Sequence, residues 1–290
     1  MIKTRGKKKG LVLSLGAAQG LAHIGVIKVL NQNNIGFDIV TGSSIGAFIG
    51  ACYAKDGDVA AVERSFLGIN LETLPKLVDP KLSILSKGLL SGDKVKELLR
   101  TIIGDVEFKD LKIPLAVVAT DVHTGEEIIF KKGSVLDAVR ASISMPGIFV
   151  PVKLNNRYLI DGGSVNPLPV DLAKKMGAEY VVVSNIVPSP AKRETGRSAK
   201  RKEEGNSRGK FIKTPFVKGD KNMPDMFSAL VQAIHITEYK IVNDRLKEAD
   251  LVITPDTKSI DSLDFTKGIE AIRKGEEAAK KALERLKDIM

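Results

Sequence analysis

Short apolar runs of strand length alternate along this chain with segments of helical periodicity, and this alternation limits the fold more than any other feature. The first run, GLVLSL, precedes a stripe of apolar residues three positions apart: Leu21, Ile24, Ile27 and Leu30. The run FDIVTG is likewise followed by the apolar helical segment IGAFIGACYA. Such alternation predicts an α/β fold with a mainly parallel central sheet covered by helices.

The same pattern continues to the end of the sequence. Further strands are predicted at IPLAVVATDV, EEIIF, RYLI, EYVVVSN and LVIT, and further helices at 135–141, 168–176, 223–246 and 267–290. We find no internal repeat and no change in composition that marks a domain boundary. The sequence therefore predicts a single domain over residues 1–290.

One segment departs in composition from the rest. Residues 188–221 are rich in Ser, Gly and Pro and carry eleven basic and four acidic residues, which accounts for +7 of the net charge of +10. We interpret this segment as a basic, disordered insertion. A solvated loop is its simplest interpretation, and contact with anionic lipid or nucleic acid is the alternative; no specific nucleic-acid partner is expected.

The uncharged stretch 10–27 has the length of a short membrane span, and the basic residues before it also suit a secretion signal. Its glycines, with Gln19 and His23, disfavour a spanning helix. LVLSL is short for a signal core and leads into a regular helical pattern. Since Cys52 is the single cysteine, no internal disulfide can form, which favours a reducing compartment. We expect a cytoplasmic protein, with any membrane contact peripheral, at the inner surface.

The sequence TGSSIGAF places a G-x-S-x-G motif at a predicted strand-to-helix junction. Gly42 and Gly46 flank Ser44 at the spacing that a sharp nucleophile turn requires, whereas Ser43 lacks such flanks. The helix that follows would direct its free amides and the positive end of its dipole at a developing oxyanion. The motif therefore favours Ser44 as a nucleophile, with a simple glycine-rich turn as the alternative.

A second glycine-containing turn follows the first predicted strand. Gly16, Ala17 and Ala18 could supply backbone N–H donors for an oxyanion hole. A phosphate-binding loop is the weaker interpretation, because the stretch from Gly16 to Gly20 lacks the G-x-G-x-x-G pattern.

The candidate bases are few. His23, His123 and His235 each lie where a structural or surface histidine is expected, although His235 could serve in a conventional triad. Asp161 is the better candidate, since it ends a predicted strand and Gly162 and Gly163 after it allow a close approach by other groups. A turn capped by Asp is the alternative interpretation.

Taken in order, these motifs resemble the patatin-like phospholipases, particularly their prokaryotic single-domain members. The resemblance extends through LVLSLGAAQGLAHIGVIKVL, GSSIGA, ATDVHTGEEIIF, VRASISMPGIFVPV, IDGGSVNPLPV and ADLVITPD. It implies a three-layer fold with helices on both faces of the sheet and a Ser-Asp dyad formed by Ser44 and Asp161. It also implies an oxyanion hole in the loop around Gly16, with no catalytic histidine, metal or cofactor.

The resemblance predicts a serine lipid acyl hydrolase of the phospholipase A or carboxylesterase type, which acts through an acyl-enzyme on a lipid or acyl ester. One departure stands out: family members usually carry a longer glycine run that ends in a basic residue and Gly, and Gln19 replaces that basic residue here. This departure supports the alternative of a weakly active or non-catalytic patatin-like protein that binds lipid or a regulatory partner.

Overall fold

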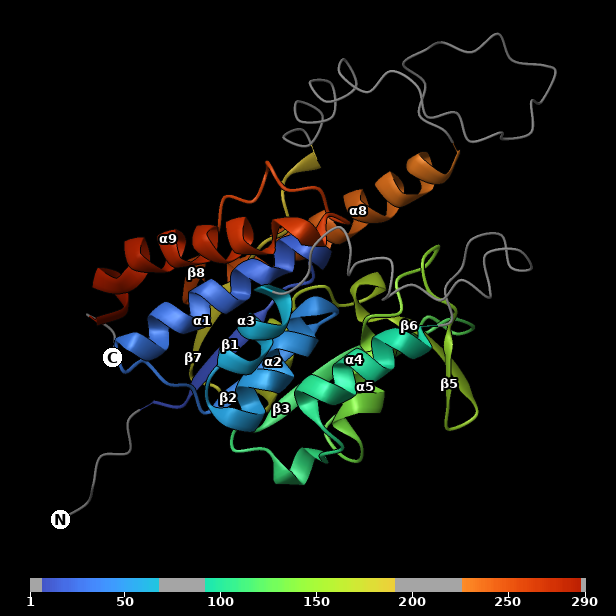
Figure 1. The fold of residues 1–290 in the computed structure, drawn as a ribbon, viewed down its shortest axis with the longest axis horizontal. Coiled ribbons are helices and arrows are strands. Elements are labelled where there is room, and N and C mark those ends of the chain that lie inside the picture. Colours follow the sequence, from blue (N-terminus) through green and yellow to red (C-terminus); the bar gives the residue numbers. More distant parts are fainter. Residues whose placement is uncertain (1–6, 68–91, 191–225, 288–290) are drawn as a thin grey trace, which may run out of the picture.

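The seven runs predicted as strands all form strands of one eight-stranded sheet. The computed structural model describes residues 7–67, 92–190 and 226–287 (Figure 1). The strands are β1 (Lys9–Leu13), β2 (Ile39–Ser43), β3 (Leu115–Asp121), β4 (Glu127–Phe130), β5 (Val152–Leu154), β6 (Arg157–Asp161), β7 (Tyr180–Ser184) and β8 (Leu251–Ile253). Their order across the sheet is β5-β6-β3-β2-β1-β7-β8, and β4 also pairs with β3.

The centre of the sheet and the edge at β8 are parallel, as predicted: β1 pairs in parallel with β2 and β7, β2 with β3, and β7 with β8. The other end is antiparallel, so the sheet as a whole is mixed. At this end β4 and β6 both run antiparallel to β3, and β5 turns directly into β6 in a hairpin that was not predicted. Its two turn residues, Asn155 and Asn156, have φ values of 48° and 62°, the left-handed conformation that two-residue hairpin turns require.

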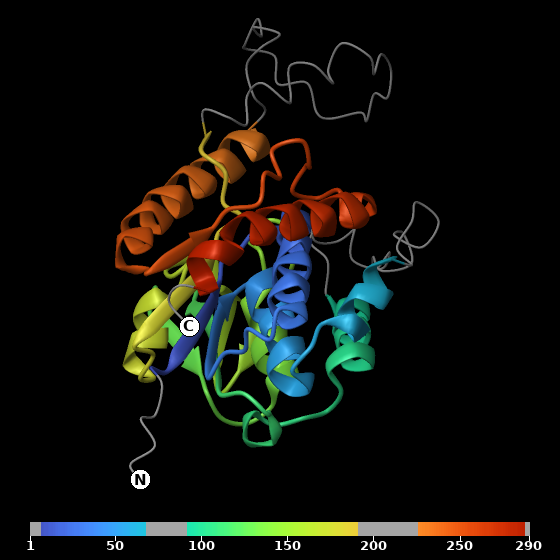
Figure 2. The ribbon, with the colours of Figure 1, turned by 90° about the vertical axis from the view of Figure 1, so that its left-hand side faces the viewer.

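Helices cover both faces of the sheet, as the resemblance implied (Figure 2). Leu11 and Leu13 of β1 point into the larger core cluster, whereas Val12 between them points into a second cluster on the opposite face. The larger cluster contains residues of α1 (Ala22–Gln32), α2 (Ile45–Asp56), α3 (Ala60–Leu67), α4 (Asp93–Ile103), α5 (Val135–Ser142) and α9 (Gly268–Lys287). The second contains residues of α6 (Val170–Lys175) and α8 (Met226–Arg245).

The predicted helices form at the expected places, but the first and last residues of some differ from the prediction. A 3-10 helix, η1 (Ala17–Leu21), precedes α1, and α6 is shorter than the predicted span of 168–176. Other short 3-10 helices are η3 (Phe108–Asp110), η4 (Gly162–Ser164), η5 (Leu246–Glu248) and η6 (Phe265–Lys267). Residues 191–221 of the predicted insertion lie outside the described residues.

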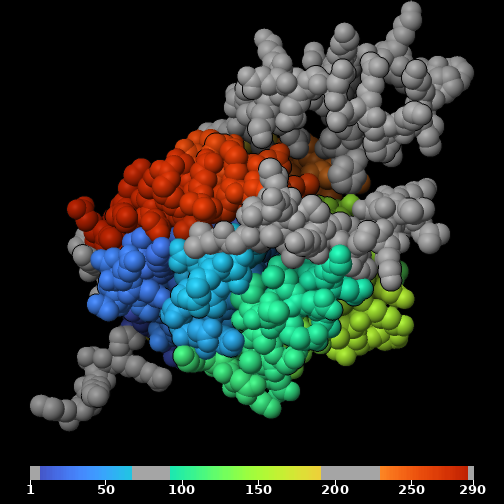
Figure 3. Space-filling model, in the orientation of Figure 1, coloured from blue at the N-terminus to red at the C-terminus, as the bar shows by residue number. Residues whose placement is uncertain are grey.

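Helices α1 and α9 pack directly against each other (Figure 3). A Cβ added to Gly25 of α1 would overlap the carbonyl oxygen of Ile272, and one added to Gly275 of α9 would overlap that of Ala22. The two glycines thus fix how closely these helices approach. Within the described ranges, no helix is both long enough and apolar enough to cross a membrane.

Candidate active site

Ser44 lies on a strained turn between β2 and α2. Its φ of 54° and ψ of −127° are unusual for a residue with a side chain, and α2 begins at the next residue. A Cβ on Gly42 would lie 2.5 Å from the Gly46 carbonyl oxygen, and a Cβ on Gly46 would lie 2.6 Å from that of Ser14. The glycines on both sides of Ser44 therefore allow the backbones of β1, β2 and α2 to approach closely. As a result, the Ser44 hydroxyl projects from the tip of a sharp turn.

Asp161 lies at the end of β6, and its carboxylate meets Ser44. Ser44 Oγ donates a hydrogen bond of 2.5 Å to Asp161 Oδ2, while the Gly163 amide donates one of 2.8 Å to Asp161 Oδ1. A Cβ on Gly162 would overlap the Val118 carbonyl oxygen. The structure therefore brings together the serine and the aspartate that the sequence analysis singled out, from positions 117 residues apart.

Asp161 is buried at the edge of the cleft. Burial raises the pKa of Asp161 to about 7, hydrogen bonds from Ser44 and Gly163 act to lower it, and the nearby charge of Glu238 raises it. A carboxyl group with a pKa near neutrality can both accept and release a proton at physiological pH.

Residues of α5 and the loop after it support both members of the pair. The Ser44 amide donates to Ser142 Oγ at 2.9 Å, and the Asp161 amide donates to the Ser144 carbonyl at 3.0 Å. Thr120 Oγ1 donates to the Asp161 carbonyl at 2.9 Å. The sequence analysis missed these roles, although Ser142 and Ser144 lie within the motif VRASISMPGIFVPV.

The loop after β1 places two of its three predicted donor residues at the site. Gly16 and Ala17 line the same cleft as Ser44, and Ala17 has a φ of 46°, in the left-handed region. The Ala18 amide instead donates to the Ser262 carbonyl at 2.9 Å. That N–H is therefore already bonded away from the cleft, and its role as an oxyanion donor stays a prediction.

Gln19 does not face the cleft. Its side chain is 3% exposed, and Nε2 donates to the carbonyls of Ile260 at 2.7 Å and Thr257 at 3.3 Å. The amide that replaces a basic residue thus fastens the loop of Gly16 and Ala17 to the segment before α9.

Two of the three histidines, His23 and His123, do not line the cleft. His23 is fully buried; its Nε2 donates to the Ser14 carbonyl, which leaves Nδ1 to accept from Ser184 Oγ, both at 2.8 Å. Burial lowers the pKa of His23 to about 4, so the ring is neutral and structural. His123 follows β3 in an exposed turn, where its ring packs edge-on against Tyr158.

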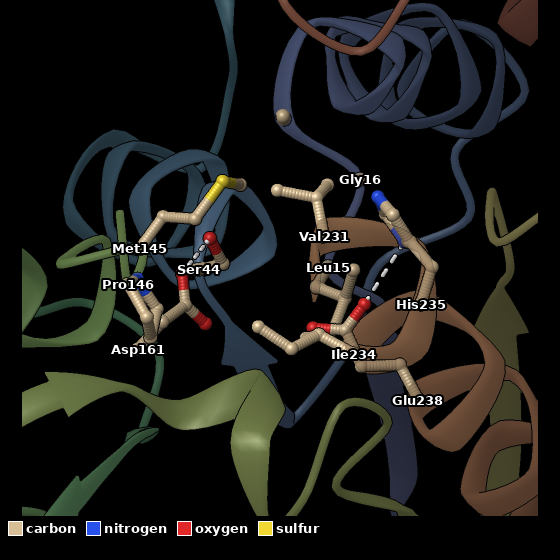
Figure 4. Close-up of a pocket in the computed structure, with 11 residues that line it drawn as sticks. Leu15, Gly16, Ser44, Met145, Pro146, Asp161, Val231, Ile234, His235 and Glu238 are labelled. Carbon is tan, nitrogen blue, oxygen red and sulfur yellow. Dashed lines mark hydrogen bonds and ion pairs between the residues drawn. The ribbon is translucent and has the colours of Figure 1, made fainter. Parts of the chain in front are cut away.

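The third histidine lines the cleft (Figure 4). His235 and Glu238 lie on α8, with His235 Nδ1 at 3.1 Å from Glu238 Oε2. Val231 and Ile234 of α8 cover the same wall, opposite Met145 and Pro146. From the sequence, His235 was an alternative triad member, whereas Val231, Ile234 and Glu238 were not predicted at the site, although the spacing of these four residues does put them on one stripe.

The cleft itself is mostly apolar and narrow. Its volume is about 30 Å³, enough for about two water molecules. An adjoining hollow of about 260 Å³ is lined by Ser164, Ala233, Ile234, Thr237 and Glu238, so Ile234 and Glu238 separate the two spaces. In the part of the chain that the structure describes, no three His, Cys, Asp or Glu side chains converge as metal ligands.

Known structures share this architecture. The crystal structure of VipD from Legionella pneumophila superimposes with a TM-score of 0.61 at 13% sequence identity, over 97% of this chain and 67% of that chain. At such low identity the likeness concerns the fold alone.

Proteins related by sequence share a higher identity with this chain than VipD does. An uncharacterized NTE family protein of Mycobacterium tuberculosis is 36% identical over 183 residues, which are 62% of this chain and 49% of that protein. Patatin-like phospholipase domain-containing protein 6 of Homo sapiens is 32% identical over 186 residues, 62% of this chain and 13% of that protein. The chain spans about half the length of the mycobacterial relatives that it matches.

The family model described as patatin-like phospholipase matches residues 11–174, more than half of the chain. That range begins in β1, contains Ser44 and Asp161, and ends in α6, so it includes both halves of the hydrogen-bonded pair. The chain belongs to the patatin-like phospholipase family.

Proposed function

We propose that this protein is a serine lipid acyl hydrolase that cleaves carboxylic esters through a Ser44–Asp161 dyad. The observation that carries the proposal is the 2.5 Å hydrogen bond from Ser44 Oγ to a buried carboxylate whose pKa is raised to about 7. The strained turn at Ser44 and the apolar lining of the cleft support the same function.

In the first half of the proposed reaction, Ser44 Oγ attacks the ester carbonyl carbon while its proton passes to Asp161. The amides of Gly16 and Ala17, with the positive end of the α2 dipole, stabilise the tetrahedral oxyanion. Asp161 then gives the proton to the departing alcohol oxygen as the C–O bond breaks. The product of this half is an acyl-Ser44 ester.

In the second half, Asp161 takes a proton from water as that water attacks the acyl carbon. The proton returns to Ser44 Oγ when the carboxylic acid departs. His235 is not needed as a base in this scheme, because the hydrogen bond from Ser44 goes to Asp161 and His235 is next to Glu238.

The narrowness of the cleft bears on the substrate. A volume of about 30 Å³ is far below the several hundred Å³ of a ligand pocket, so an acyl chain enters only when the cleft widens. The second candidate function, a family member that binds lipid or a regulatory partner and turns over slowly, rests on Gln19 in place of the usual basic residue. A cytoplasmic location with peripheral contact at an anionic membrane surface remains part of the proposal.

The proposal is tested by covalent labelling with a fluorophosphonate probe at pH 8, with mass spectrometry to locate the adduct. We expect the adduct on Ser44 and loss of labelling in Ser44→Ala. In Asp161→Asn the labelling rate should be at least 100-fold lower, since a positioned proton acceptor typically raises a reaction rate about 10²–10⁴-fold. Ser43→Ala is the matched control, because Ser43 is a buried neighbour whose hydroxyl has no hydrogen-bond partner.

Either of two results contradicts the dyad: undiminished labelling of Asp161→Asn, or no labelling of folded wild-type protein. The second result would favour the lipid-binding candidate. Fast labelling combined with slow release of the acyl group from simple esters would place the limitation in the second half of the reaction.

A further inference from the structure

Glu238 is a buried acidic residue for which the proposed dyad has no direct use. It is 9% exposed and lines the cleft from α8, facing Asp161 across Ile234 (Figure 4). Its Oε2 has no hydrogen-bond partner, since the 3.1 Å contact with His235 Nδ1 lacks hydrogen-bond alignment. An incompletely satisfied buried carboxylate is costly, so its position calls for a physical reason.

Glu238 shares a neighbour with the catalytic carboxylate. A Cβ built on Gly163 would lie 3.1 Å from Asp161 Oδ1 and 3.2 Å from Glu238 Oε1, so these two oxygens are at most 6.3 Å apart, the sum of the two distances. Gly163 has no such Cβ, and its amide binds Asp161 Oδ1. The missing side chain at Gly163 therefore leaves the two carboxylates facing each other across η4.

We propose that Glu238 is a positioning residue of this site, whose carboxylate makes Asp161 a stronger base toward Ser44 by placing a like charge beside it. This inference rests on the dyad proposed above. Two nearby carboxylates ionise less readily together than apart, so a proton transferred from Ser44 to Asp161 is held more tightly when Glu238 is charged. The direction agrees with the contribution of Glu238 to the raised pKa of Asp161.

Charged side chains on β3, β5, β6 and α5, the elements around Asp161, have partners of their own. In the described part of the chain, these partnerships join Asp121 of β3 with Arg157 of β6, Arg140 of α5 with Ser144, Asp137 of α5 with Lys96, and Lys153 of β5 with the ring of Tyr158. On α8 itself, His235 is the neighbour of Glu238. We therefore expect removal of the Glu238 charge to change the basicity of Asp161.

The test is the rate of Ser44 labelling as a function of pH in wild type and Glu238→Gln. Gln keeps the size of the side chain and removes its charge. Coulombic interaction over about 6 Å at an intermediate dielectric constant predicts that the acid limb of the profile moves down by about one pH unit. A weaker base also lowers the plateau rate at high pH by a few fold.

Asp244→Asn is the control, because Asp244 lies on the same helix with its side chain 75% exposed. Its acid limb should coincide with that of wild type. Glu238→Asp, which withdraws the charge by one methylene group, should shift the limb in the same direction by a smaller amount, and it serves if Glu238→Gln does not fold.

The outcomes separate this inference from the function on which it rests. A profile of Glu238→Gln that loses rate without any shift of the acid limb overturns the inference, because it indicates a purely structural role. In that case the dyad stands if Ser44 is still labelled in an Asp161-dependent way. Absence of labelling in wild type would instead overturn the proposed function.

Discussion

The Asp161 carboxyl group is more easily protonated in the folded protein than in the unfolded chain, and this difference links the proposed active site to stability. Its folded pKa of about 7 exceeds the ordinary value of 3.8, so between these values the folded state binds more protons than the unfolded state. The contribution of this group to stability is fully present below about pH 4 and is lost as the pH rises through about 7.

We therefore expect Asp161→Asn to become progressively more stable than wild type between pH 4 and pH 8, with no further change above. Urea denaturation of both proteins across this range measures the difference in the free energy of unfolding. Asp256→Asn, an exposed carboxylate change on the loop after β8, should show no such rise. A stability difference independent of pH would mean that the group titrates normally.

Among the elements, the short η1 helix connects the proposed oxyanion loop to the C-terminal part of the chain. Gln19 bonds to the carbonyls of Ile260 and Thr257, and the Ala18 amide bonds to Ser262. These bonds hold Gly16 and Ala17 from the side remote from the cleft. They also explain why an amide, which donates to carbonyls without carrying charge, suits this buried position.

Gln19→Ala should lower the free energy of unfolding by about 1–3 kcal/mol, because it removes the side-chain donor from the buried Ile260 carbonyl, while the Thr257 carbonyl keeps the Ile260 amide. It should also slow the labelling of Ser44, since the loop of Gly16 and Ala17 loses its anchor. The control is Asn33→Ala, which removes a side-chain bond to the Val29 carbonyl at the far end of α1. If Gln19→Ala labels as fast as wild type, Gln19 has no part in shaping the site.

The strands were predictable at the level of elements because buried parallel strands are nearly continuous apolar runs. The hairpin of β5 and β6 was missed because Val152–Leu154 is only three residues long and half-buried, too short for an alternating pattern to show. Sequence spacing also led directly to Ser44, Gly42 and Gly46, because a nucleophile turn is a local structure. Asp161 was found from the two glycines that follow it.

The unpredicted parts of the site depend on contacts between distant elements. Ser142 meets the Ser44 amide across 98 residues, and His235 and Glu238 reach the cleft only because α8 packs across η4. Periodicity locates the buried stripe of such a helix but does not tell which other element it faces.

Across the whole molecule, the contact of α1 with α9 joins the two ends of the chain. Gly275→Ala would force a methyl group into the Ala22 carbonyl. Although Ala favours helices by about 1 kcal/mol over Gly, overpacking against backbone typically costs about 1–3 kcal/mol, so we expect a net loss of stability. A thermal unfolding scan should show a lower Tm for Gly275→Ala. Gly36→Ala, where an added Cβ meets nothing within 4 Å, should not change it; equal midpoints for both variants would show that the helices can separate slightly at no cost.

The separation of Ser44 and Asp161 by 117 residues has a consequence for watching the protein fold. Ser44 directly follows β2 and Asp161 ends β6, and β3 lies between these strands in the sheet. An activated serine can therefore exist only after all three strands have assembled in register. An active-site probe added at successive times during refolding would report the moment at which this half of the sheet closes, as a covalent record that survives later analysis.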